Sequence, residues 1–100
     1  MSTSLSVRAR PIGGRDLRYL LTSKLFEHGP LSLHRLVELV AADGFDLDGR
    51  RSKVVSDSLR WEVARGRAVR LGRGRYGPGV VPPTTAWRIR HRVQALTAER

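Results

Sequence analysis

The side chains most able to do chemistry in this chain are cations, and they gather in the second half of the sequence. Residues 1–49 carry as many acidic as basic side chains, so the formal net charge of +10 arises entirely from residues 50–100. The stretch Arg50–Arg75 holds nine basic residues against two acidic ones, Asp57 and Glu62. Such asymmetry is typical of a surface that binds a polyanion. A GC-rich genome would raise arginine everywhere and would not leave the first half neutral.

Little in the sequence suggests catalysis, a cofactor or a metal. His28, His34 and His91 fall on three different expected elements and have no partner at metal-ligand spacing. The segment Gly72–Gly77 has the glycine spacing of a dinucleotide-binding loop, but prolines follow it where that loop needs a helix. The segment Asp43–Gly49 hints at a calcium loop, but its ligand spacing fails. We therefore expect no enzyme, cofactor, metal site or small-molecule ligand.

Length and composition limit the class of protein. The 100 residues predict one small domain, and the lack of cysteine fits a reducing compartment such as the cytoplasm. No apolar run is long enough to span a membrane. Residues 1–14 have no acidic side chain and predict a flexible basic arm that carries Arg8 and Arg10. A transit peptide is the less favoured interpretation of this segment.

Three helices are predicted in the first two thirds of the chain. Apolar side chains at helical spacing predict a helix over 15–28, which Gly29 ends. Ser32 is a natural N-cap for a second helix, and Gly44 fits the left-handed position after its end. After a short loop, a third helix is expected over 51–65. Its inner stripe consists of Val55, Leu59 and Val63.

A basic hairpin and a last helix complete the predicted fold. Strands are expected over 68–71 and 75–77, joined by a tight turn. Alternation along the first strand predicts that Val69 and Leu71 face the core and that Arg70 faces outward. A proline-containing linker leads to a final amphipathic helix that starts near Thr84 or Thr85 and reaches about Ala98. The apolar seam of that helix comprises Ala86, Ile89, Val93 and Leu96.

Three helices followed by a glycine-tipped basic hairpin resemble a winged helix-turn-helix. The resemblance covers about residues 15–77. We expect the winged-helix domain to span residues 15–79, and the linker and last helix to span residues 80–100. The segments Ser56–Val63 and Gly72–Tyr76 are similar to small bacterial winged-helix proteins, including the HARE-HTH type. The resemblance implies a mainly α fold with a small β-hairpin wing. It also implies that the third helix enters the major groove of DNA and that the wing touches the backbone or minor groove.

The phase of the third helix separates its candidate DNA contacts from its inner stripe. A step of about 100° per residue places Lys53, Asp57 and Arg60 on the side of the helix opposite the inner stripe. Ser56 lies at the edge of that side. Arg60 could read guanine, and Asp57 could either accept from cytosine or pair within the helix with Lys53 or Arg60. Both interpretations of Asp57 stay open. Two further cations, Arg50 and Arg51, stand at the entrance to the helix, where phosphate is favoured.

The hairpin carries a second group of candidate contacts. Arg67, Arg70, Arg73 and Arg75 crowd about a dozen residues. Arg73 lies between two glycines at the tip, where it could enter an A·T-rich minor groove. The local Arg73-Gly74-Arg75 resembles the core of an AT-hook, although that motif continues with proline and Tyr76 follows here. The alternative is a solvated wing with no defined contact.

The last helix allows two arrangements. Its seam of Ile89, Val93 and Leu96 either packs onto its own domain near Trp61 or pairs with a second copy in a dimer that also uses Trp87. The dimer is favoured because it doubles the phosphate contacts. Trp61 is expected to be core and a seat for this helix rather than a base-stacking residue. Arg88 and Arg92 lie on another face and could reach the backbone of the same duplex.

These observations predict a protein that binds double-stranded DNA and acts by binding alone. Its expected role is that of a bacterial transcriptional regulator or small nucleoid-associated protein, located in the cytoplasm at the nucleoid. A protein-interaction or antitoxin-type winged helix is the alternative, although the basic helix and wing together count against it. A structured-RNA binder is disfavoured because sequence-specific recognition of RNA depends on aromatic stacking surfaces, and only 6% of the residues are aromatic.

Overall fold

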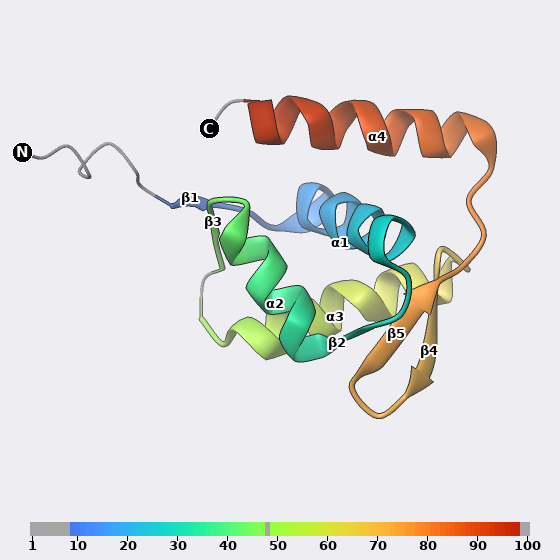
Figure 1. The fold of residues 1–100 in the computed structure, drawn as a ribbon, viewed down its shortest axis with the longest axis horizontal. Coiled ribbons are helices and arrows are strands. Elements are labelled where there is room, and N and C mark those ends of the chain that lie inside the picture. Colours follow the sequence, from blue (N-terminus) through green and yellow to red (C-terminus); the bar gives the residue numbers. More distant parts are fainter. Residues whose placement is uncertain (1–8, 48, 99–100) are drawn as a thin grey trace, which may run out of the picture.

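The computed structural model describes residues 9–47 and 49–98, which form four helices and two small sheets (Figure 1). The helices are α1 (Gly14–His28), α2 (Leu33–Ala42), α3 (Arg51–Ala64) and α4 (Pro83–Ala98). The strands are β1 (Arg10–Pro11), β2 (Leu31–Ser32), β3 (Phe45–Asp46), β4 (Ala68–Gly72) and β5 (Arg75–Pro78). Each predicted helix and both hairpin strands are present. Among the helices that the structure describes, none has the length and apolar character needed to cross a membrane.

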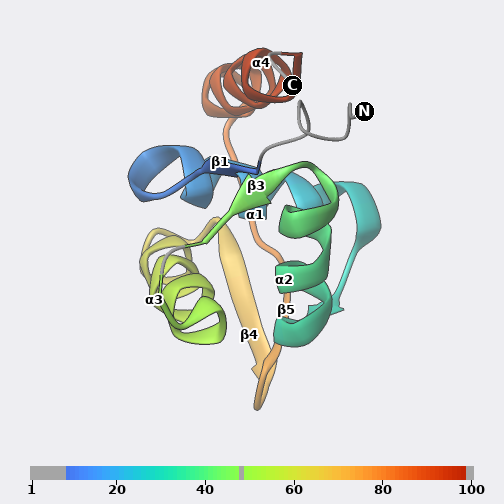
Figure 2. The same ribbon diagram turned by 90° about the vertical axis from the view of Figure 1, so that its left-hand side faces the viewer.

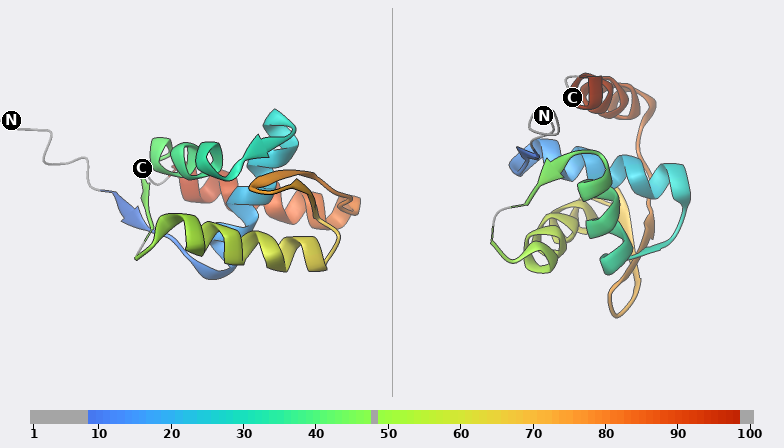
Figure 3. Two further views of the ribbon diagram at one scale, coloured as in Figure 1. Left: turned by 90° about the horizontal axis from the view of Figure 1, so that it is seen from below. Right: turned by 60° about the vertical axis from the view of Figure 1, so that its left-hand side comes forward.

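Helix α1 is the centre of the fold. Its buried residues occupy several sides of the helix rather than one stripe, and a helix with that pattern is enclosed by its neighbours. They are Leu17, Tyr19, Leu20, Leu21, Thr22 and Leu25. Helices α3 and α4 both pack against α1. Figures 1 and 2 show α4 on one side of α1, with α3 and the hairpin tip on the other. Seen from below, α4 is partly hidden behind the other helices (Figure 3).

Helix α2 begins and ends where its local sequence predicts. The Ser32 side chain accepts a hydrogen bond of 3.0 Å from the backbone N–H of Arg35, so the predicted N-cap is confirmed. Gly44 follows the helix with a φ of +89°, which confirms its predicted left-handed conformation. Such capping fixes both ends of α2 independently of tertiary contacts.

A three-stranded antiparallel sheet joins the hairpin to the start of α2. The strand order is β2-β5-β4, with Leu31 opposite Tyr76. The carbonyl of Gly74, at the hairpin turn, accepts a hydrogen bond of 2.8 Å from the backbone N–H of Leu33. At the other end, Gly79 donates to the carbonyl of Arg67, where any side chain on Gly79 would collide with the backbone. The hairpin is therefore held at its tip and at its base.

The predicted orientation of β4 is wrong. Val69 and Leu71 are 43% and 52% exposed, whereas Tyr76 is buried. Arg70 is directly opposite Tyr76 in the β4–β5 ladder. Because residues directly opposite each other in an antiparallel pair project from the same face, Arg70 lies on the inner face with Tyr76. The alternation of apolar residues predicted the wrong inner face because Ala68 and the partner strand β5, rather than Val69 and Leu71, determine which side of β4 is buried.

The segment before α1 is not a free arm where the structure describes it. Strand β1 pairs in parallel with β3. The Arg10 guanidinium lies over the Phe45 ring, 5.2 Å from its centre, and donates a hydrogen bond of 2.5 Å to the carbonyl of Leu96. The predicted mobility is thus wrong for Arg10, and Arg8 lies outside the described residues. The loop expected after Gly44 likewise begins as a strand, and Leu47 is buried.

Helix α4 packs onto its own domain, which is one of the two predicted arrangements. Ile89 and Leu96 are buried and Val93 is half-buried, so the seam is used within the chain. The guanidinium of Arg92 donates two hydrogen bonds of 3.0 Å each to the carboxylate of Asp16 at the start of α1. The seat of α4 is α1 and not Trp61, which corrects the predicted contact.

The Asp16–Arg92 pair predicts a pH-dependent contribution to stability. Its hydrogen bonds, and the charges of Arg92 and Arg15, hold the pKa of Asp16 below its ordinary value, although partial burial opposes the shift. A carboxyl with a lowered folded-state pKa stabilises fully above its unfolded pKa of about 3.9, and this contribution is lost as the pH falls through the folded value. We expect Asp16→Asn to lower the urea midpoint at neutral pH, with the difference shrinking as the pH falls below the unfolded pKa and vanishing once it is below the lowered folded pKa. A difference that stays constant with pH would contradict this assignment.

Candidate nucleic-acid interface

The outer part of α3 and the inner face of the hairpin meet in a shallow hollow. Its volume is about 310 Å³, and it is lined by Ser56, Arg60, Val63, Arg70 and Tyr76. Ser56 and Arg60 come from α3, and Arg70 comes from β4. The reversed phase of β4 is what brings Arg70 here, because an outward Arg70 would have pointed away from α3. Three predicted DNA contacts, two from α3 and one from β4, are thus neighbours.

Six arginines on these two elements are exposed and form no ion pair within residues 9–47 and 49–98. They are Arg50, Arg51, Arg60, Arg70, Arg73 and Arg75. Arg50 and Arg51 stand at the N-terminal end of α3, whose dipole adds to their positive potential. Arg73 and Arg75 stand at the hairpin tip, beside the start of α2. We call α3 and the β4–β5 hairpin with these six arginines the basic surface.

The two acidic residues of this region do not neutralise the basic surface. The carboxylate of Asp57 lies 3.0 Å from the ammonium of Lys53, so one of the interpretations left open for Asp57 is observed. Both side chains are exposed to solvent, where an i,i+4 pair of this kind contributes only about 0.3–0.5 kcal/mol. The pair can therefore open on contact with a partner. Glu62, the second acidic residue, is buried on the inner side of α3 and does not reach the basic surface.

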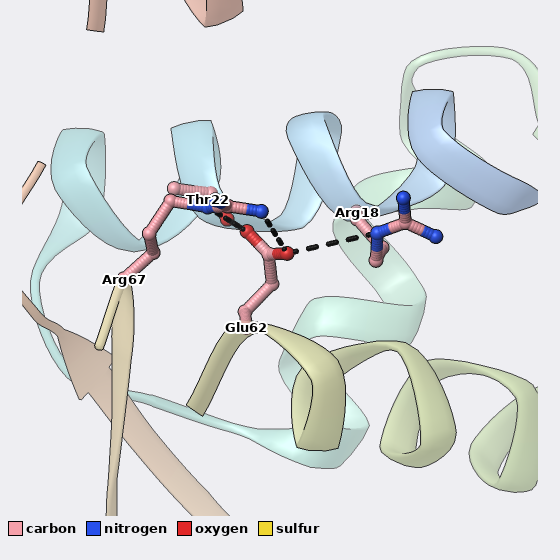
Figure 4. Close-up of polar contacts among 4 residues, drawn as sticks. All are labelled: Arg18, Thr22, Glu62 and Arg67. Carbon is pink, nitrogen blue, oxygen red and sulfur yellow. Dashed lines mark hydrogen bonds and ion pairs between the residues drawn. The ribbon is translucent and has the colours of Figure 1, made fainter. Parts of the chain in front are cut away.

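Glu62 is the centre of a buried polar cluster that sequence reasoning missed (Figure 4). Its side chain is 0% exposed. The Thr22 hydroxyl donates to Glu62 Oε1 at 2.6 Å, and the Arg67 guanidinium donates to both carboxylate oxygens at 2.9 and 2.7 Å. Arg18 Nε lies 3.7 Å from Glu62 Oε2. One carboxylate therefore connects α1, α3 and the start of the hairpin.

This cluster removes Arg67 from the group of hairpin arginines that could meet a partner. The hydrogen bonds with Glu62 raise the pKa of Arg67 above its ordinary value, against the effect of burial. Arg67 is therefore a fixed structural cation. The sequence did contain a signal for the pair, because Glu62 continues the stripe of Val55 and Leu59 at spacings of seven and three. A carboxylate on a buried stripe requires a partner.

Trp61 is a surface residue, so the prediction that it is core is wrong. It is 50% exposed and is flanked by two guanidinium groups, Arg65 at 4.1 Å and Arg18 at 5.0 Å from the ring centre. The reason is helical phase: Trp61 lies about 100° beyond Arg60, on the flank of α3 away from the hairpin hollow. Cation–π contacts with both arginines hold the ring there.

Two predicted contacts on α4 do not join the basic surface. Arg92 is bound to Asp16, and α4 as a whole lies across α1 from α3 (Figure 1). The structure therefore places neither Arg88 nor Arg92 beside α3, and their contact with DNA stays a prediction. Trp87 is 55% exposed and stacks on His91, with ring centres 3.9 Å apart. The other predicted packing residues, Ile89, Val93 and Leu96, serve the α1–α4 contact.

No family model, no curated protein and no solved structure matches this chain. Within the described residues, no group of three or more histidines, cysteines or carboxylates is placed to hold a metal ion. Interpretation of the basic surface therefore depends on its own geometry and charge.

Proposed function

We propose that this chain is a winged-helix protein that binds duplex DNA through its basic surface, as a transcriptional regulator or small nucleoid-associated protein of the nucleoid. One observation carries the proposal. Arg60 of α3 and Arg70 of β4 line a common hollow without any acidic partner in the part of the chain that the structure describes. Unpaired cations that converge from two elements suit a polyanion that is wide enough to touch both.

The order and pairing of the elements support the winged-helix assignment. Helices α1 to α3 are followed directly by the β4–β5 hairpin, and β2 between α1 and α2 adds to the same sheet. Helix α3 turns its buried residues, Val55 and Leu59, toward the core and its polar side toward solvent. A helix about 10–12 Å wide with a polar outer side fits a major groove about 12 Å wide.

The side chains of α3 divide into two roles under this proposal. Arg60 and Ser56 reach base edges, where arginine suits guanine and serine suits several bases. Arg50 and Arg51 contact phosphates at the helix entrance. Lys53 exchanges its partner Asp57 for a phosphate, and the released Asp57 is then available to a cytosine amino group.

The hairpin supplies a contact of a different kind. Arg73 projects from a turn whose next residue, Gly74, has a φ of +66°, a conformation that residues with side chains rarely adopt. The Gly74 carbonyl is bound to the start of α2, which fixes the direction of the tip. A single arginine on a fixed, narrow turn suits a minor groove, whose negative potential is strongest over A·T-rich sequence.

The decisive experiment is a salt series with duplex DNA. If about five of the exposed cations meet phosphates, the logarithm of the binding constant should fall with the logarithm of salt concentration at a slope of about −4 to −5. Fluorescence anisotropy of a labelled duplex measures this slope. Single-stranded DNA and duplex RNA serve as comparisons. A slope near zero, or no duplex binding at low salt, would contradict DNA binding and favour the alternative of a protein-interaction module.

Single substitutions should separate base reading from groove and backbone contact. Arg60→Ala is expected to weaken a preferred sequence by about 1–3 kcal/mol more than it weakens random DNA. Arg73→Ala should weaken all duplexes similarly, or A·T-rich ones selectively. Arg35→Ala, on α2 and already paired with Glu38, is a matched arginine control. Equal losses for Arg60→Ala on every duplex would indicate binding without sequence preference.

A further inference from the structure

A second basic surface lies on α4, on the side of the molecule away from the hairpin tip (Figures 1 and 2). Between Pro83 and Ala98 the sequence has three arginines and one histidine but no acidic residue. Arg88, Arg90 and His91 are exposed. Neither Arg88 nor Arg90 forms an ion pair with any residue that the structure describes. The basic surface of α3 leaves this group of cations unexplained.

The exposed ridge of α4 has a cation on each flank. Ile89 faces α1, which turns the stacked pair of Trp87 and His91 to solvent. At about 100° per residue, Arg88 and Arg90 fall on opposite sides of this ridge. Two rows of phosphate border each groove of a duplex, so a helical ridge with cations on both flanks complements a groove. An acidic segment of a protein presents no such paired rows.

Helix α4 is also fixed relative to the rest of the domain. Arg92 binds Asp16 through two hydrogen bonds, and Arg10 donates to the carbonyl of Leu96. Ile89 and Leu96 are buried against the core. The ridge therefore cannot swing round to the duplex that α3 would occupy. Any polyanion that it binds is a second one.

We infer that the α4 ridge binds a second segment of duplex DNA, so that one chain bridges two duplexes. The inference rests on the proposed binding of a first duplex by α3 and the hairpin. A single monomer then acts as a bridge without dimerisation, because its two basic surfaces lie on opposite sides of α1.

A bridging assay tests this inference. One duplex is immobilised on beads, and recovery of a second, fluorescent duplex is measured with the full-length chain. Arg88→Gln/Arg90→Gln should lower this recovery at least about tenfold while changing affinity for a single free duplex by less than about threefold. Arg88→Lys/Arg90→Lys should retain bridging, since lysine also binds phosphate as a point charge.

The matched control removes two charges from the other surface. Arg70→Gln/Arg73→Gln should lose single-duplex affinity, which excludes a general effect of net charge. A wild-type chain that binds no duplex would contradict the proposed function itself. A wild type that binds one duplex without bridging, or an Arg88→Gln/Arg90→Gln variant that bridges fully, would overturn this inference alone. Light scattering that finds a protein dimer in the bridged complex, abolished by Trp87→Ala, would also overturn it.

Discussion

Replacing Glu62 by alanine is expected to lower the free energy of unfolding by about 3–5 kcal/mol. The substitution leaves the largely buried Arg67 without its two hydrogen-bond acceptors and the buried Thr22 hydroxyl without its own. An uncompensated buried charge is among the most costly defects in a small domain. The loss is a large fraction of the roughly 5–15 kcal/mol that holds a typical domain together. Urea unfolding followed by circular dichroism measures it.

Two variants define what this result means. Glu38→Ala removes an exposed glutamate that pairs with Arg35 and His34, and we expect it to cost less than about 1 kcal/mol. Glu62→Leu/Arg67→Met removes both charges and should recover much of the stability, because an apolar pair needs no partner. Equal urea midpoints for Glu62→Ala and Glu38→Ala would contradict the role of the buried cluster.

Removing α4 is expected to unfold the domain rather than to release a folded monomer. The dimer favoured in the sequence analysis would give the second outcome, but Ile89 and Leu96 are only 4% and 6% exposed in the contact with the rest of the domain. Losing that burial costs about 1.5–3 kcal/mol for each side chain, and Asp16 loses its partner as well. A chain that ends at Val81 keeps the hydrogen bonds at the base of the hairpin, so the defect lies at α1 and β1, where α4 packs.

A milder pair of substitutions keeps this test informative if the truncated chain aggregates. Leu96→Ala should cost about 2–5 kcal/mol, whereas Trp87→Ala, on the exposed side of the same helix, should cost little. Thermal unfolding compares the two variants, and light scattering gives their masses. If the full-length chain were a dimer and the truncated chain a folded monomer, the apolar seam of α4 would be a dimer interface instead.

Local signals in the sequence predicted the elements well. Ser32 and Gly44 act through hydrogen bonds and backbone conformation within a few residues, so the limits of α2 follow from its own sequence. The limits of α1 and α3 agree with the periodicity to within one residue. Helix α4 begins at Pro83, one or two residues before the predicted start, because proline is well suited to the first turn of a helix.

The candidate site was predicted less completely because its contacts are distant in sequence. Arg92 is bound to Asp16 across 76 residues, and Thr22 reaches Glu62 across 40. Contacts at such large separations produce no periodic pattern in the sequence from which they could be predicted. The orientation of Arg70 depends on Tyr76 in the partner strand rather than on alternation within β4. The sequence could therefore name the exposed cations of α3 and the hairpin, but not which of the others are held in internal ion pairs.

The hydrogen bond between Arg10 and Leu96 has a practical consequence for anyone who attaches this protein to a surface or a dye. The first and last elements of the described chain, β1 and α4, meet there, and α4 lies across α1 from the hairpin tip (Figure 1). A tether joined through α4 leaves α3 open to a duplex in solution but crowds the α4 ridge. Immobilised protein would then report single-duplex binding faithfully and underestimate bridging, so labels for the bridging assay belong on the DNA.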